Sequence, residues 1–131
     1  MPYSPDALRG RTIFVAEDEY YLADYIVSAI QSAGGTVQGP FPSAGQALDG
    51  LSDTADLPDA ATLNINLLDG PSYPVADALA DANIPFLFAS ANSSATLPPR
   101  FSRSPLLAKP FAAYQVVQAL LALLDGERAS V

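Results

Sequence analysis

The sequence predicts an α/β fold in which a doubly wound parallel sheet of five strands carries helices on both faces. Three observations favour this class. Short apolar runs alternate with segments whose apolar residues recur at helical spacing, and the turn residues are spread along the chain. The length of 131 residues fits about one domain by the usual range of roughly 100 to 200 residues. We expect that domain at residues 11–126, with an N-terminal extension at 1–10 and a C-terminal tail at 127–131.

Five short apolar runs are predicted to be strands. They contain β-branched and aromatic residues and are bounded by turn residues. In chain order, these runs cover residues 12–16, 36–39, 61–65, 84–89 and 106–108. The segment from Ser90 to Ser104 contains Ser, Asn and the pair Pro98-Pro99, so we expect at most a short or broken helix there.

Four segments between or after these strands are predicted to be helices, because their apolar residues recur every three or four positions. They cover residues 22–33, 43–51, 74–82 and 111–124. Gly34 provides a stop for the first, and Ser43 with Gln46 forms a capping-box sequence that opens the second. Pro74 fits the first turn of the third. The core stripe of the last helix is predicted to contain Val116, Val117, Leu120, Leu121 and Leu124.

Composition and charge exclude several functions. The net charge is −8 with only 6 basic residues, so we expect no direct binding to nucleic acid or to a membrane. There is no Cys and no His, which excludes thiol and imidazole catalysis and zinc-finger sites. The first residues do not resemble a signal peptide, and no apolar run has the length of a membrane span, so a cytoplasmic location is expected.

Polar side chains follow four of the predicted strands, at the sheet edge where ligands bind in folds of this class. Acidic groups that converge there repel each other unless a cation joins them, and an oxygen-only set suits Mg²⁺. A lysine and a hydroxyl opposite these acidic groups would complement a phosphoryl group. Taken one at a time, the residues have simpler explanations: Glu17 and Asp18 fit a helix cap, Lys109 fits a solvated lysine, and Ser90 fits a turn residue. The candidate site residues are Glu17, Asp18, Asn64, Asn66, Ser90 and Lys109.

Four motifs in this order resemble the receiver domain of bacterial two-component response regulators. The similarity covers about residues 11–125 and implies a flavodoxin-like fold with strand order 2-1-3-4-5. Phe88-Ala89-Ser90 and the non-aromatic Leu106 resemble the FAT GUY subgroup of receivers. A nucleotide or flavin binder with a similar fold is disfavoured, because no Gly-rich loop follows the first predicted strand. The four motifs are Val15–Glu19, Leu63–Leu67, Phe88–Ser90 and Lys109–Phe111.

The resemblance implies a phosphoryl switch, in which a histidine kinase or a phosphotransfer protein donates phosphate to an aspartate with Mg²⁺ bound. Glu17 and Asp18 match the acidic pair that holds the metal, and the backbone carbonyl of Asn66 matches a further ligand. Ser90 matches the hydroxyl that turns toward the phosphate. Lys109 matches the cation that pairs with it, and its bond to Pro110 is expected to be cis.

Asn64 matches the phosphoacceptor position, and it departs from the family pattern. An amide oxygen is neutral and its nitrogen is conjugated, so Asn64 should not accept phosphate. The lost negative charge predicts weakened or lost Mg²⁺ binding. The sequence therefore predicts an atypical pseudo-receiver of a two-component phosphorelay, not an enzyme, which works by binding a kinase, a phosphotransfer protein or another signalling protein.

The alternative is a phosphoaccepting receiver in which Asn64 was introduced by mutagenesis, or in which Asp69 replaces it as nucleophile. Asp69-Gly70 is also a typical turn pair. Two further departures, Leu106 from the wider family and the pair Ala91-Asn92 from the subgroup, favour natural divergence over an introduced change.

The last predicted helix also has apolar residues outside its core stripe, namely Ala112, Ala119 and Leu123. This predicts a partner or homodimer surface formed by the last strand and helix, although a terminal helix with a few small exposed residues explains the pattern equally well.

Overall fold

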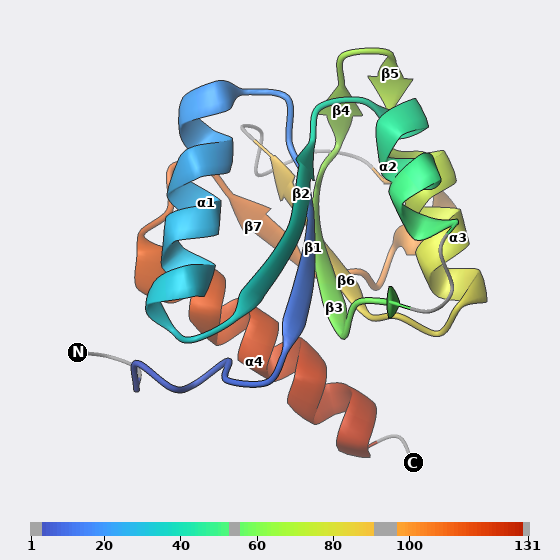
Figure 1. Cartoon of the computed structure of the whole chain (residues 1–131). Helices are drawn as coiled ribbons and strands as arrows, with labels where there is room; N and C mark the ends of the chain where they lie inside the picture. The colour runs from blue at the N-terminus through green and yellow to red at the C-terminus, as the bar shows by residue number, and fades with distance from the viewer. Residues whose placement is uncertain (1–3, 53–55, 91–96, 130–131) are drawn as a thin grey trace.

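Five parallel strands form the central sheet of the computed structural model, which describes residues 4–52, 56–90 and 97–129, the last three by backbone alone (Figure 1). The strand order is β2-β1-β3-β6-β7, and every neighbouring pair is parallel. This confirms the predicted doubly wound sheet of order 2-1-3-4-5. The strands are β1 (Thr12–Ala16), β2 (Thr36–Phe41), β3 (Ala60–Asn64), β6 (Phe86–Ser90) and β7 (Leu106–Ala108).

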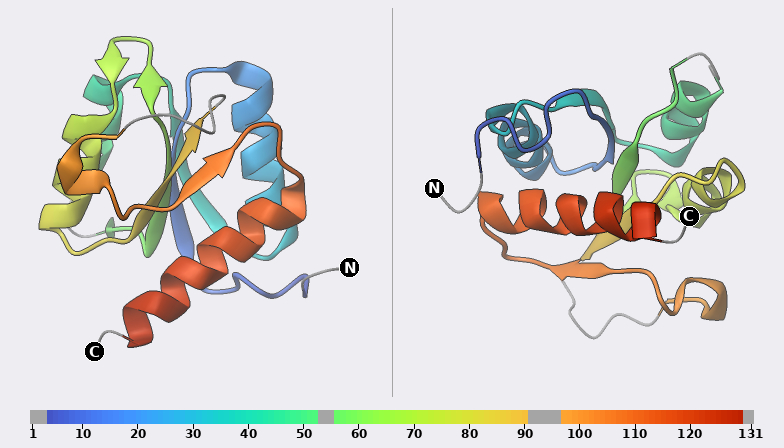
Figure 2. Two further views of the ribbon diagram at one scale, coloured as in Figure 1. Left: turned by 180° about the vertical axis from the view of Figure 1, so that it is seen from behind. Right: turned by 90° about the horizontal axis from the view of Figure 1, so that it is seen from below.

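Helices cover both faces of the sheet (Figures 1 and 2). On one face lie α1 (Tyr20–Ser32) and α4 (Ala113–Ala129), which contact each other. On the other lie α2 (Ala44–Leu51) and α3 (Tyr73–Asp81). The helices of residues 4–52, 56–90 and 97–129 include none that is long and apolar enough to cross a membrane.

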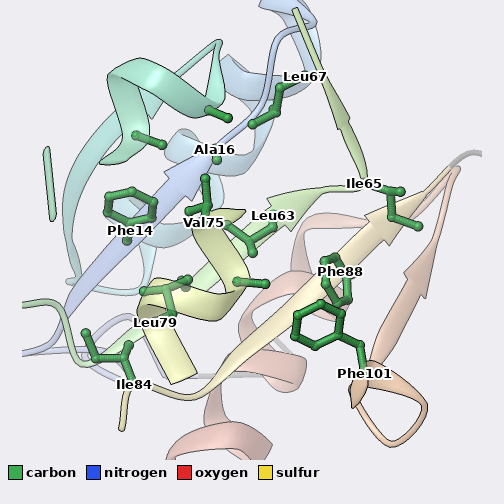
Figure 3. Close-up of a cluster of buried hydrophobic side chains, with 14 residues drawn as sticks. Phe14, Ala16, Leu63, Ile65, Leu67, Val75, Leu79, Ile84, Phe88 and Phe101 are labelled. Atoms are coloured by element: carbon green, nitrogen blue, oxygen red, sulfur yellow. The ribbon is translucent and has the colours of Figure 1, made fainter. Parts of the chain in front are cut away.

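The alternation of side chains along β1 divides the core into two clusters. Ile13 and Val15 point toward α1 and α4, whereas Phe14 and Ala16 point toward α2 and α3. This is the period of two expected for a strand buried on both faces. Figure 3 shows the second cluster, in which Phe14 lies near residues of β3 and α3.

The described part of the connection between β6 and β7 is anchored to α3. It contains the short 3-10 helix η2 (Pro99–Phe101), as expected for this Pro-rich segment. The Phe101 ring meets Phe88 edge to face at 5.6 Å (Figure 3). The same ring stacks on Tyr73 at 5.7 Å. Beside it, Arg100 donates two hydrogen bonds to Asp77, at 2.9 and 3.1 Å. The pair Ala91-Asn92 lies outside the described residues.

The chain around the predicted domain boundaries is part of the folded unit. Leu8, in the predicted extension, is fully buried in the cluster with α1 and α4, and its N–H donates to Ala33 O at 2.8 Å. At the other end, α4 continues to Ala129, past the predicted helix end at Leu124. We expect the helix to end at Leu124 from the sequence, because the residues that follow show no periodic apolar pattern.

The segment before α3 and the length of β2 also differ from the predictions. A hairpin of β4 (Asn66–Leu67) and β5 (Gly70–Pro71) precedes α3, and strands of this length show no periodic pattern in a sequence. Strand β2 continues past Gly39 to Phe41, because an edge strand tolerates the Pro40 that would interrupt a central one. Gly39 has φ of 103°, and an added Cβ would lie 2.6 Å from Val15 O, so only glycine fits.

Candidate functional site

The side chain of Asn64 lies between two carboxylates at the carboxyl ends of β1 and β3. Its Nδ2 donates to Glu17 Oε2 at 2.8 Å and to Asp18 Oδ1 at 3.1 Å. The strand register explains this contact, because Ala16 pairs with Leu63 and the residues after them are therefore neighbours. The parallel sheet thus brings together three of the predicted site residues.

Glu17 is the most buried acidic residue of this group, with 2% of its surface exposed. Its Oε2 also accepts the N–H of Glu19 at 3.1 Å, and its Oε1 lies 3.4 Å from Lys109 Nζ in an ion pair. Burial raises the pKa of the Glu17 carboxyl, against the opposing effects of the Glu19 N–H, the Lys109 charge and the Asn64 amide. The carboxylate is therefore surrounded by donors that compensate part of its desolvation.

The third acidic residue of the run, Glu19, performs a different task. Its carboxylate is the N-cap of α1 and accepts the N–H groups of Tyr21 and Leu22, at 3.2 and 2.8 Å. A helix cap was the simpler interpretation of Glu17 and Asp18, but in this structure Glu19 caps α1. Sequence reasoning did not identify Glu19, because three consecutive acids before a helix give no signal that distinguishes the cap.

Ser90 ends β6 and Lys109 directly follows the neighbouring strand β7, on the other side of β3 from β1. Ser90 is buried at the end of β6, and its carbonyl accepts the N–H of Lys109 at 2.7 Å. The strand β3 pairs with β6 through Asn64 and Ala89, which places Ser90 one residue further along the adjacent strand. The Lys109-Pro110 bond is cis, as expected.

Asn66 and Asp69 lie beyond the strand end, in the β4–β5 hairpin. Asn66 begins β4 and pairs with Pro71. The contribution of its carbonyl to a metal site stays a prediction. Asp69 lies in the hairpin turn, and its carboxylate accepts the N–H groups of Ala44 and Gly45 at 2.7 and 3.0 Å. These bonds lower the pKa of Asp69 and hold it at the start of α2.

The arrangement does not fit a divalent cation as it stands. Mg²⁺ requires oxygen ligands, and the carboxylate oxygens of Glu17 and Asp18 that face Asn64 already accept its N–H groups. A cation that bound these two oxygens would compete with the Asn64 amide for them. In the part of the chain that the structure describes, no three or more His, Cys, Asp or Glu side chains form a group that could hold a metal.

The solved structures that share this architecture include response regulators and receiver proteins of bacteria. A response regulator receiver protein from Sinorhizobium medicae WSM419 is 25% identical, with a TM-score of 0.74, over 89% of this chain and 96% of that one. The response regulator PhyR from Brucella abortus is 25% identical with a TM-score of 0.77, over 96% of this chain and 53% of PhyR. SdrG from Sphingomonas melonis Fr1 is 38% identical with a TM-score of 0.76, over 90% of this chain and 98% of SdrG.

The chain belongs to the response-regulator receiver family. Receiver domains are signalling domains of two-component systems and have the flavodoxin-like fold described above. No protein-family model matches this receiver, and no curated protein matches it.

Proposed function

We propose that this receiver is not phosphorylated at the usual position and acts in a phosphorelay by protein–protein interaction, as a member of the FAT GUY-like subgroup. Asn64 occupies the phosphoacceptor position in this proposal. The observation that supports it most directly is the pair of hydrogen bonds from Asn64 Nδ2 to Glu17 and Asp18. Those carboxylates require a donor opposite them, so the amide nitrogen faces the acids.

The chemistry of the amide supports the same proposal. Phosphoryl transfer needs an anionic oxygen in line with the phosphorus atom. Asn64 has a neutral oxygen, and its nitrogen is conjugated and donates two hydrogen bonds. Glu17, Asp18 and the Asn66 carbonyl remain the proposed metal positions, with Mg²⁺ bound weakly or not at all. Ser90 and Lys109 remain the proposed phosphate-facing positions.

The contacts also support a receiver held in one conformation. Through Glu17, the Asn64 amide ties β3 to the end of β1, and Lys109 ties the residue after β7 to the same carboxylate. These bonds occupy groups that a phosphate or a cation would otherwise engage. Regulation would then come from a kinase, a phosphotransfer protein or another signalling protein that binds one state preferentially, since such a ligand shifts the population of states.

Asp69 is a poor substitute nucleophile in this arrangement. Both of its carboxylate oxygens accept N–H groups at the start of α2, and attack on phosphorus would cost those bonds.

The other alternative is an asparagine introduced at position 64. In that case the other site residues would be intact, and the protein should accept phosphate once the aspartate is restored.

The test compares the unmodified chain with Asn64→Asp and with Asp69→Asn, each incubated with acetyl phosphate and Mg²⁺ and measured by intact mass. We expect no phosphoryl addition to the unmodified chain or to Asp69→Asn, and addition to Asn64→Asp if the other groups still work. Addition to the unmodified chain that Asp69→Asn abolishes would refute the proposal. SdrG has a BeF3-activated conformation, so the same three proteins can be titrated with BeF3 and compared by NMR.

A further inference from the structure

The connection between β7 and α4 is held at both ends by groups of the β1–α1 segment. At its start, Lys109 Nζ lies 3.4 Å from Glu17 Oε1, in the ion pair described above. At its end, the Ala113 N–H donates to the Tyr25 hydroxyl at 2.9 Å, across 88 residues of sequence. Glu17 follows β1 and Tyr25 lies in α1, so one continuous stretch of chain fixes both ends of a distant connection.

The sequence gives α4 no capping residue of its own. The residues before the helix and at its first position, Pro110–Ala113, include no Ser, Thr, Asp or Asn, the types that usually accept the free N–H groups at a helix start. The Tyr25 hydroxyl accepts one of these groups, and the Gln115 side chain accepts that of Ala112 at 2.7 Å. The start of α4 therefore depends on a hydroxyl that another helix supplies.

The connection leaves little freedom between its two ends. The Lys109 N–H donates to Ser90 O at 2.7 Å, which fixes the backbone of the lysine to the sheet. Pro110 has a restricted φ, and Phe111 packs partly against the core cluster that α1 and α4 share. Because the Ala113 N–H is also held, the position of the lysine and the position of the helix start are linked.

The ion pair at the site requires accurate placement of the lysine. The side chain of Glu17 is 1% exposed and that of Lys109 is 20% exposed, so water screens the pair only slightly. Within the part of the chain that the structure describes, Glu17 Oε1 accepts no hydrogen bond, which leaves the ammonium group as its compensation. A lysine side chain is flexible, so its position depends on the backbone that carries it.

We propose that Tyr25 is a positioning residue of the site, whose hydroxyl fixes the start of α4 and thereby holds Lys109 against Glu17. The inference deepens the proposed function and rests on it in one respect, since there partner binding rather than phosphate changes the state of the site. A movement of α4 would reach the buried carboxylate through Lys109. It would then reach Asn64 through the hydrogen bond at 2.8 Å.

The test uses the only lysine of the chain as its reporter. Isotope-labelled lysine gives one side-chain signal in NMR, that of Lys109. Tyr25→Phe removes the hydroxyl and keeps a ring that is 43% exposed. We expect solvent exchange of the Ala113 amide to become roughly fivefold faster, the effect of one ordinary hydrogen bond. The lysine signal should move toward its position in Glu17→Gln, where the ion pair is absent, and the urea-unfolded chain gives a second unpaired reference.

Two further variants complete the test. Tyr114→Phe is the matched control, since its hydroxyl makes no hydrogen bond among the described residues and its ring is 41% exposed beside Ala113. It should change neither measurement. Adding Ala112→Ser to Tyr25→Phe gives α4 a cap of its own at the residue before the helix, and it should restore both the amide protection and the lysine signal.

Three results would overturn the proposal. The first is an unchanged Lys109 signal in Tyr25→Phe, which would make Tyr25 only an anchor of α4. The second is unchanged exchange of the Ala113 amide in that variant. The third is an equal displacement of the lysine signal in Tyr114→Phe.

These outcomes are independent of the phosphorylation test. If the unmodified chain accepts phosphate from acetyl phosphate, the proposed function fails while the result at Tyr25 still stands. If the chain accepts none and the Lys109 signal does not move in Tyr25→Phe, only the positioning role fails.

Discussion

The side-chain nitrogen of Asn64 lies 2.8 Å from Glu17 Oε2, so a neutral amide joins the ends of two central strands where two acidic groups would otherwise face each other. The same nitrogen donates to Asp18. Asparagine and aspartate have nearly the same shape, so the difference between them at this position is electrostatic. The stability of the fold should therefore depend on which of the two is present.

Asn64→Asp should destabilise the receiver in a chelator by about 1 to 3 kcal/mol, because it replaces two donated hydrogen bonds with carboxylate repulsion. Added Mg²⁺ should restore part of that loss, since a cation can then join three carboxylates. Urea unfolding with EDTA and with Mg²⁺ measures both effects. Gln118→Glu is the control at an exposed position of α4, and it should change stability by no more than about 0.5 kcal/mol. Equal stability of Asn64→Asp and the natural chain in EDTA would contradict this account.

Lys109→Met should cost about 1 to 3 kcal/mol at neutral pH, because it leaves the buried Glu17 carboxylate without its ion-pair partner. The pH dependence follows from the raised pKa of Glu17. Between its ordinary and its raised pKa, the folded state binds more protons than the unfolded state, so stability falls as pH rises through that interval. The total fall should be larger in Lys109→Met, because the Lys109 charge opposes the rise of the Glu17 pKa. Urea midpoints measured from acid to neutral pH check the slope, with the exposed Arg103→Met as control.

Asp69→Asn should destabilise the start of α2, because the charged acceptor for two N–H groups is lost. The pKa of Asp69 is lowered by these bonds, so its contribution is present above the ordinary aspartate pKa and disappears as pH falls through the lowered value. The difference in urea midpoint between the two proteins should therefore shrink in acid. A difference that stays constant with pH would show that charge is not involved, and Asp24→Asn provides an exposed control.

Gly39→Ala should destabilise the receiver by about 2 kcal/mol or more, since alanine disfavours a φ of 103° and its Cβ would lie 2.6 Å from Val15 O. Gly126→Ala is the matched control in α4, where nothing lies within 4 Å of the added Cβ. That change should stabilise the helix by about 0.5 to 1 kcal/mol. Thermal unfolding of the two variants should therefore give shifts of opposite sign.

Leu8→Ala should cost about 2 to 5 kcal/mol, the usual range for a fully buried leucine. Leu68→Ala, at a 71% exposed position, should cost little. Urea denaturation compares them. A small effect at Leu8 would support the view of residues 1–10 as an extension that the domain does not need.

The elements with a strong apolar pattern were predictable from the sequence. The bounds of β1 and β7 are those expected, and the Ser43 hydroxyl caps α2 by accepting the N–H of Gln46. The core stripe of α4 is buried at four of its five positions, and Leu121 is partly buried against the same cluster. Ala119 and Leu123 also pack partly against that cluster, so they leave less of α4 for the expected partner surface.

The features that escaped prediction depend on contacts between distant residues. The burial of Leu8 depends on its contact with the chain at Ala33, and the role of Asp69 depends on α2 beginning beside the hairpin turn. The exposure of Tyr20 and Tyr21 could not be deduced either, because tyrosine is common both in cores and on surfaces. At the site, the sequence indicated which groups lie at the same edge of the sheet. The hydrogen bonds of the Asn64 amide could not be predicted, because they depend on the register between β1 and β3.

The exposed tyrosines of α1 and α4 also give this receiver a spectroscopic signal of its own. The chain has no tryptophan, so its ultraviolet fluorescence comes mainly from its 6 tyrosines, and Tyr20, Tyr21, Tyr25 and Tyr114 are each more than 40% exposed. A partner protein that covers those rings should change their emission directly, so its binding could be followed without a dye or a tag.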